Sequence, residues 1–195
     1  MTDHPERGGH TVTDHPLSRG GSCDLPEAQT LRTDLTHRRF DRATFGWDGV
    51  PAQVYKRGDA GSAGLGWRDV VRHTLAGGDG LAFQLRYFEI RPNGFSSLEK
   101  HLHAHTIVVL RGRGRVVAGA QVFSVEPFDL VVIPPGTPHQ FVTAGDEPFG
   151  FLCPVDAQRD APQAVSREEL QSLLADPDVR AVIRVAAMAA DPQAG

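Results

Sequence analysis

The chain has 195 residues, 40% of them hydrophobic, so it is long enough for one domain with a core of its own. The net charge of −4 comes from interspersed acidic and basic residues without a basic run, which argues against a nucleic-acid partner. No stretch approaches the roughly 20 apolar residues that span a bilayer, and the first residues lack the apolar run of a signal peptide, so we expect a cytoplasmic protein without a membrane partner.

Residues 1–45 form a polar segment rich in Gly, Pro, Asp, His and Arg, with no apolar periodicity. We predict that this segment is a mobile N-terminal arm, although a shorter ordered arm between Leu31 and Trp47 is an alternative that the sequence leaves open. Cys23 lies in this polar segment and Cys153 in an apolar run, so the sequence predicts reduced thiols and not a disulfide.

Residues 46–160 consist of short β-type runs separated by Gly, Pro and Asp, a pattern typical of an antiparallel all-β domain. Turn residues such as Pro92-Asn93-Gly94 favour sharp reversals between the runs. Many short strands joined by tight turns favour a jelly-roll barrel of two antiparallel sheets. The predicted strands are Ala52–Lys56, Asp69–Leu75, Leu81–Arg91, Ser97–His103, His105–Arg111, Arg113–Ala118, Gln121–Val125, Leu130–Ile133, His139–Thr143 and Phe149–Pro154.

Residues 161–195 have a helical pattern and form the predicted C-terminal tail. Ser166 and Glu169 are spaced as a capping box, which marks the start of a helix. Pro177 is expected to divide the tail into two short helices, because proline interrupts helical hydrogen bonding. Apolar residues recur at helical spacing at Leu170, Leu173, Leu174, Val179, Val182 and Ile183.

A dense set of candidate metal-binding side chains lies on two consecutive predicted strands, Ser97–His103 and His105–Arg111. Alternate residues of a strand face the same side, so a regular strand would project all of them together. Imidazoles with a carboxylate suit a divalent transition metal better than Ca²⁺ or Mg²⁺. The alternating candidates are Glu99, His101, His103 and His105, and His139 follows a rigid Pro-Pro-Gly-Thr-Pro turn further along.

These two stretches resemble the cupin superfamily, whose first motif is G-x5-H-x-H-x3-E-x6-G. The spacing matches throughout, with Asn93 in place of the first Gly, Glu99 in place of the first His and His105 in place of the Glu. The second motif, G-x5-P-x-G-x2-H-x3-N, retains its proline, its middle glycine and its histidine, here His139, whereas Phe128 and Thr143 replace the flanking Gly and Asn. The resemblance covers roughly residues 80 to 155 and implies a small, single-domain, metal-binding cupin.

The resemblance can be placed in two frames. One takes His101 and His103 as the His-x-His pair, but it finds no acidic residue at the position where the motif needs one. The other keeps the distance to Gly112, and its metal ligands are Glu99, His101, His105 and His139. In this frame His103 becomes a proton carrier or orienting residue near the opening, and an exposed loop histidine is the alternative for it. A metal-free cupin, in which these groups only form hydrogen bonds, is the alternative to the whole ligand set.

Several neighbouring residues are candidates for the wall of the pocket. Gln84 and Arg86 share one face of the strand before the first motif with Phe88, and the other face carries Phe83, Leu85 and Tyr87, so the sequence leaves open which set lines the pocket. Phe141 should face inward like His139, and Cys153 is a candidate thiol near the metal, with an inert buried cysteine as its alternative.

The implied cofactor is one divalent transition metal, with Fe or Mn favoured over Ni, Cu, Co or Zn. Such a site leaves coordination positions open, so the sequence predicts a metal-dependent enzyme with a small organic substrate, foremost a dioxygenase-type oxygenase with His103 as its catalytic residue. The alternatives are a lyase or isomerase with a redox-silent metal and a non-catalytic binding or sensing cupin. The resemblance also implies a homodimer.

Overall fold

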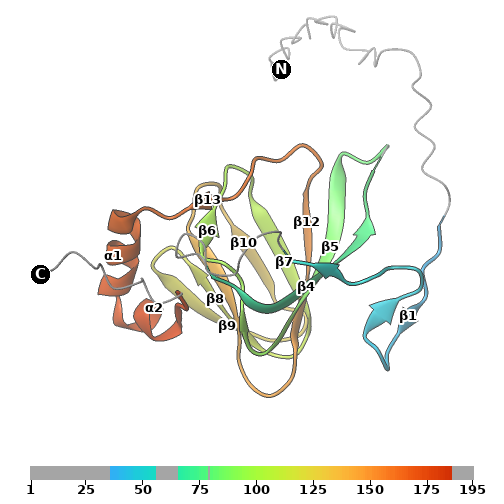
Figure 1. Ribbon diagram of the computed structural model, residues 1–195, viewed down its shortest axis with the longest axis horizontal. Helices are drawn as coiled ribbons and strands as arrows, with labels where there is room; N and C mark the ends of the chain where they lie inside the picture. Colours follow the sequence, from blue (N-terminus) through green and yellow to red (C-terminus); the bar gives the residue numbers. More distant parts are fainter. Residues whose placement is uncertain (1–35, 56–65, 79, 186–195) are drawn as a thin grey trace, which may run out of the picture. The chain divides into compact units, whose positions relative to one another are not determined.

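The computed structural model describes residues 36–55, 66–78 and 80–185 (Figure 1). Apart from a small N-terminal hairpin, its strands belong to one antiparallel sheet that continues through eleven strands. The strands are β1 (Phe40–Asp41), β2 (Gly46–Trp47), β3 (Gln53–Val54), β4 (Arg68–Ala76), β5 (Phe83–Phe95), β6 (Glu99–Lys100), β7 (His105–Arg111), β8 (Gly114–Ala118), β9 (Gln121–Val125), β10 (Leu130–Ile133), β11 (His139–Thr143), β12 (Phe149–Asp156) and β13 (Gln163–Ala164).

The sheet curls into two layers because the long strand β5 takes part in both (Figure 1). Most of β5 pairs with β4 on one side and β12 on the other, and β12 continues to β7 and β10. The end of β5 reaches the other layer, where Phe95 pairs with Val142 of β11, and β11 continues to β8 and β9. The predicted all-β jelly roll is therefore confirmed, with β5 as the strand that the two layers share.

The prediction of a turn at Pro92-Asn93-Gly94 is wrong, because β5 runs through these residues to Phe95. Asn93 takes a positive φ of 63°, which an asparagine tolerates. A Cβ on Gly94 would come within 2.8 Å of the backbone oxygens of Arg68 and Arg91. The three residues thus bend the strand toward the other layer without ending it.

The strand predicted over Ser97–His103 is also wrong in extent, since only Glu99 and Lys100 form β6. His139 of β11 pairs with Glu99, and the Gly136 N–H then donates to the His101 carbonyl at 2.7 Å. The chain therefore leaves the sheet after Lys100 and rejoins it at His105. His101 and His103 lie on a loop that β6 and β7 hold at its ends.

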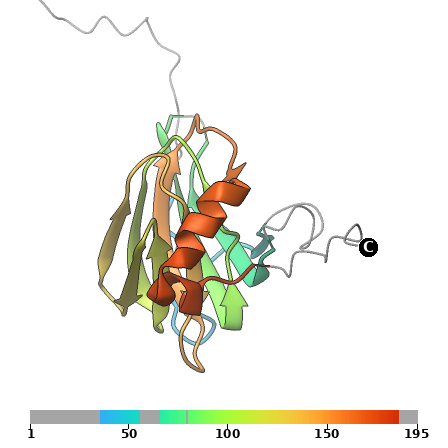
Figure 2. The same ribbon diagram turned by 90° about the vertical axis from the view of Figure 1, so that its left-hand side faces the viewer.

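Two predicted helices are confirmed, α1 (Arg167–Ala175) and α2 (Pro177–Val182). Ser166 and Glu169 make the reciprocal capping-box hydrogen bonds, and Pro177 begins the second helix. Figure 2 shows both helices lying across one face of the sheet. Their apolar side chains close a second core cluster: Leu98, Val117, Val142, Leu173, Val179, Val182 and Ile183.

The main core lies between the layers, and a separate aromatic group lies outside it. Strands β1 and β2 form a hairpin whose Trp47 contacts Tyr87 of β5, with ring centroids 5.2 Å apart. The ordered arm that the sequence left open is thus present from Phe40 to Trp47, while residues 1–35 of the predicted arm, including Cys23, lie outside the described residues. Within the described ranges, no helix has the length and apolar character needed to cross a membrane.

The close packing at Tyr87 predicts that Gly150 tolerates no side chain. A Cβ on Gly150 would come within 2.0 Å of the Tyr87 hydroxyl, which is fully buried. We expect Gly150→Ala to lower the free energy of unfolding by about 1–3 kcal/mol, because overpacking forces the neighbours to shift. Chemical denaturation measures this change. The control is Gly46→Ala, whose nearest neighbour would lie at 3.4 Å; equal effects of the two substitutions would contradict the packing argument.

Candidate metal centre

A cavity of about 940 Å³ opens between the two layers of the sheet. Its wall contains all the predicted metal donors. The sequence predicted that one regular strand would place most of these donors on one face, whereas in the structure a loop and the ends of several strands bring them together. The residues that line it at this end are Glu99, His101, His103, His105 and His139.

Three of these histidines form a cluster that fits a cupin metal site. His101 comes from the loop, His105 from the start of β7 and His139 from the start of β11. All three are buried, and one ligand atom from each lies within 4.8 Å of the others. The Nε2 atoms of His101 and His105 are 2.6 Å apart. Three imidazoles at these separations can bind one divalent transition metal.

Hydrogen bonds behind two of the imidazoles, those of His101 and His139, fix which nitrogen of the ring faces the cluster. His101 Nδ1 lies 3.1 Å from the His103 carbonyl oxygen, and His139 Nδ1 lies 2.9 Å from the Thr137 carbonyl oxygen. A carbonyl only accepts, so both Nδ1 atoms carry the proton and donate it, which leaves Nε2 as the nitrogen that can bind a metal. Such backing is the usual support of metal-binding histidines, and the donor set therefore fits a metal.

Burial keeps two of the three imidazoles uncharged, as metal binding requires. Burial, followed by the neighbouring His139, lowers the pKa of His101 to about 4. The same two causes, with a further contribution from His101, lower the pKa of His105 to about 2. Both imidazoles are neutral at pH 7 and do not have to lose a proton before they bind a cation.

Glu99 lies on the same cavity wall, directly opposite His139 in the pairing of β6 with β11. Its carboxylate is buried and accepts a hydrogen bond from the Ser97 hydroxyl at 2.6 Å. It is outside the three-histidine cluster as defined by distance. Its role as the fourth ligand stays a prediction.

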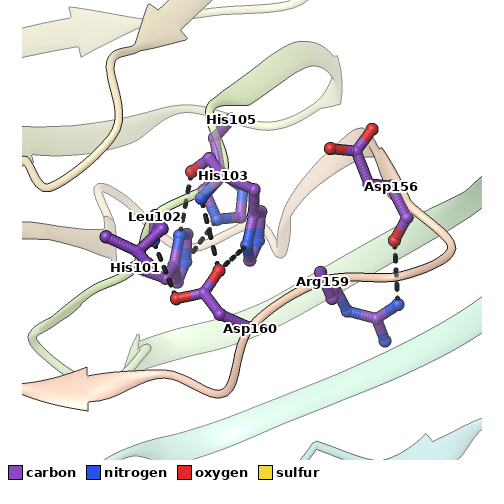
Figure 3. A network of polar contacts seen from close by, with 7 residues as sticks. All are labelled: His101, Leu102, His103, His105, Asp156, Arg159 and Asp160. Atoms are coloured by element: carbon purple, nitrogen blue, oxygen red, sulfur yellow. Dashed lines mark hydrogen bonds and ion pairs between the residues drawn. The ribbon is translucent and has the colours of Figure 1, made fainter.

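His103 is held at the cavity by Asp160, a residue that sequence reasoning missed (Figure 3). The Asp160 carboxylate accepts hydrogen bonds from the Leu102 N–H at 2.7 Å and from His103 Nδ1 at 2.7 Å. The Leu102 bond, followed by the His103 bond, lowers the pKa of Asp160 to about 2. The His103 ring stacks on His101, with centroids 3.9 Å apart, so it is a fixed cavity residue and not an exposed loop side chain.

The predicted pocket residues divide into two groups. Arg86, Phe141 and Cys153 line the cavity. Gln84 does not, and instead its side chain accepts a hydrogen bond from Arg159 at 3.3 Å. Cys153 Sγ lies 3.0 Å from His105 Nδ1, and burial raises the pKa of this thiol. Sequence reasoning missed the further lining residues Tyr55, Arg72 and Arg159, which no motif includes.

The ligand set predicts which substitutions release the metal. We expect His101→Ala, His105→Ala and His139→Ala each to lower the bound metal far below one ion per chain, because each removes one of three converging nitrogens. Elemental analysis of the purified variants measures the content, and exposed His37→Ala is the control. Glu99→Ala should lose metal and His103→Ala should keep it; the reverse would contradict the frame counted from Gly112.

Acid should destabilise the metal-free protein. Between about pH 6.5 and pH 4 the unfolded chain takes up protons at His101 and His105. In the folded protein these two imidazoles stay largely unprotonated, because their pKa values are lower there. The unfolded state binds more protons in this window, so stability falls as the pH falls through it. Thermal unfolding in the presence of a chelator measures this slope. A His105→Gln variant should show a shallower slope, and an equally steep one would exclude His105 as the source.

Comparison with known proteins agrees with the fold. Residues 86–155 match the family described as Cupin domain. Over 150 residues the chain is 44% identical to 1-methylthio-D-xylulose 5-phosphate methylsulfurylase of Rhodospirillum rubrum, a match that covers 77% of this chain and 93% of that protein.

Solved structures give the same result. A crystal structure of a cupin-2 domain from Rhodospirillum rubrum has 44% identity and a TM-score of 0.64, covering 73% of this chain and 93% of that one. A cupin 2 conserved barrel domain protein from Rhodopseudomonas palustris has 36% identity and a TM-score of 0.69, covering 76% and 99%. With its barrel, its three-histidine cluster and these relatives, the chain belongs to the cupin family.

Proposed function

We propose that this chain is a metal-dependent enzyme that removes the methylthio group from a small phosphorylated ketose. The observation that carries the proposal is the convergence of three imidazoles beside a buried thiol, His105 Nδ1 lying 3.0 Å from Cys153 Sγ. The name of the Rhodospirillum rubrum relative supports the substrate class, since it specifies a 1-methylthio pentulose 5-phosphate and a methylsulfur group.

The chemistry of such a substrate matches what the cavity holds. Carbon 1 of the ketose lies next to its carbonyl, so the bonding pair of the carbon–sulfur bond can pass to carbon 1 when a thiolate takes the methylsulfur group as a disulfide. The carbonyl takes up the negative charge, and a proton delivered to carbon 1 completes a methyl ketone. The thiol is oxidised and carbon 1 is reduced, so the electrons balance. A second thiol, supplied as a reductant, then restores the first.

Residues of the cavity are suited to these roles. When bound to the three histidines, a divalent metal supplies Lewis-acid stabilisation of negative charge on a carbonyl oxygen. Cys153 is the thiol that takes the methylsulfur group. Burial raises its pKa, the nearby Arg86 guanidinium favours its thiolate, and its contact with His105 fixes the sulfur at the metal end of the cavity. His103, oriented by Asp160, delivers the proton to carbon 1.

The dioxygenase expected from the sequence is the second candidate function. Three imidazoles with a nearby carboxylate also suit iron, and buried Glu99 beside the cluster favours such a redox metal. The two candidates differ in one measurable reactant, because a dioxygenase consumes O₂ and methylthio transfer to a thiol consumes none.

The experiment that tests the proposed function offers the metal-loaded protein 1-methylthio-D-xylulose 5-phosphate with a thiol reductant. We expect a methyl ketone and a methyl disulfide at a rate independent of O₂. Cys153→Ala should lower kcat by at least about a hundredfold while the metal content stays unchanged, because a nucleophile has been removed. Product analysis by mass spectrometry and an oxygen electrode provide the measurements.

Each outcome decides one part of the proposal. Full activity of Cys153→Ala would show that the added thiol is the direct acceptor and would remove Cys153 from the mechanism. O₂ uptake coupled to substrate loss would establish the dioxygenase instead. Tight binding of the substrate without any product from the metal-loaded protein would favour a non-catalytic binding cupin. The control is Cys153→Ser, which keeps the size of the side chain and should be as inactive as the alanine variant.

A further inference from the structure

Three arginines gather on one wall of the cavity, from three different parts of the chain. Arg72 lies on β4, Arg86 on β5 and Arg159 in the segment after β12, and all three line the cavity. The pairing of β4 with β5 places Thr74 opposite Arg86, so Arg72 and Arg86 occupy diagonal positions on neighbouring strands. Arg159 reaches the same wall through its bond to Gln84, which lies two residues before Arg86 on β5.

None of these guanidinium groups has a carboxylate partner among the described residues. Arg72 donates to the Gln53 side chain at 3.2 Å, and Arg86 donates to the Cys153 sulfur at 3.8 Å. Arg159 donates to the Asp156 backbone carbonyl at 3.3 Å (Figure 3). It also donates to the Gln84 side chain at 3.3 Å. By contrast, Arg111, outside the cavity, is paired with Glu89 at 2.8 Å.

Two of the three cavity arginines, Arg72 and Arg86, have a hydrogen-bond donor that is not used. The Nε atoms of Arg72 and Arg86 are both buried and have no hydrogen-bond partner. Arg86 is only 7% exposed, although a buried charge is normally paired. Buried donors that stay unpaired are costly, so their retention in a cavity indicates a ligand that completes them.

The three positive charges also act on one another. Burial, followed by Arg86, lowers the pKa of Arg72, and burial followed by Arg86 and Arg72 lowers the pKa of Arg159. The acidic side chains that line the cavity form their hydrogen bonds at the metal end. Asp160 accepts hydrogen bonds from the Leu102 N–H and from His103, and Glu99 accepts one from the Ser97 hydroxyl. The cavity therefore has a positive wall whose charge an incoming anion can neutralise.

We propose that Arg72, Arg86 and Arg159 form the binding site for the phosphate group of a phosphate-monoester substrate. The inference deepens the proposed function, on which it rests for the identity of the substrate. A dianionic phosphate offers several acceptor oxygens, and guanidinium groups bind it with paired, charge-assisted hydrogen bonds.

The position of the arginine wall also fits a bifunctional substrate. Cys153 Sγ contacts His105 on one side and Arg86 on the other, at 3.0 Å and 3.8 Å. The phosphate end of a small sugar can therefore lie at the arginines while its other end reaches the sulfur and the histidine cluster. Arg86 acts as the central anchor, and its guanidinium lies 5.0 Å from the Phe88 ring centroid, which holds it in place.

The test measures binding of inorganic phosphate, D-xylulose 5-phosphate and D-xylulose to the metal-loaded full-length protein by calorimetry. The variants are Arg72→Gln and Arg159→Gln, and the control is Arg91→Gln, an exposed arginine on the same strand as Arg86. We expect each cavity variant to weaken the binding of both phosphates about tenfold or more, because a charged hydrogen-bond donor is lost. Metal content and the affinity for D-xylulose should stay unchanged, as should all affinities of Arg91→Gln.

The outcomes separate this inference from the proposed function. Unchanged phosphate affinity in both cavity variants, or equal affinity for D-xylulose and its 5-phosphate, would overturn the arginine site. Tighter binding of succinate than of inorganic phosphate would also overturn it, in favour of a carboxylate site. Phosphate binding that depends on the arginines, in a protein that leaves the methylthio ketose intact, would support the site and contradict the proposed reaction.

Discussion

The pairing of β11 with the short strand β6 is the contact on which the site depends. It places His139 directly opposite Glu99 although 40 positions separate them in the sequence, and it leaves the loop after Lys100 anchored by the Gly136 N–H. The loop then brings His101 back against His105 at the start of β7. Without this backbone pairing, the two motifs would carry the same residues but would not form one metal site.

The cavity combines two environments that favour opposite charges. At one end, burial keeps His101 and His105 neutral, so that their lone pairs are available to a cation. On the adjoining wall, guanidinium groups stay charged without carboxylate partners among the described residues, and they favour an anion. Cys153 lies between the two ends. A small molecule with a carbonyl at one end and a phosphate at the other complements both environments.

Much of the barrel could be predicted, because short runs between Gly, Pro and Asp mark strands and turns locally. The prediction failed at two places. At Pro92-Asn93-Gly94, residues typical of a turn bend strand β5 without ending it. After Lys100, strand β6 ends although the alternating pattern predicted that it would continue. Both deviations depend on partners far away in the sequence. The departure of Phe128 from the motif is locally accommodated, since this residue takes the positive φ of 79° that a glycine would adopt.

The sequence by itself determined the fold class, the helical tail with its Ser166 cap, and the histidines that form the metal cluster, since spacing along the chain encodes all of these. The tertiary structure alone decided which residues surround that cluster. Asp160 holds His103, and Arg72 and Arg159 join Arg86, through contacts between segments that no motif connects. The physical reason is that strand spacing is a local property, whereas the charges that meet in a cavity depend on how the sheet curls and on which loops close over it.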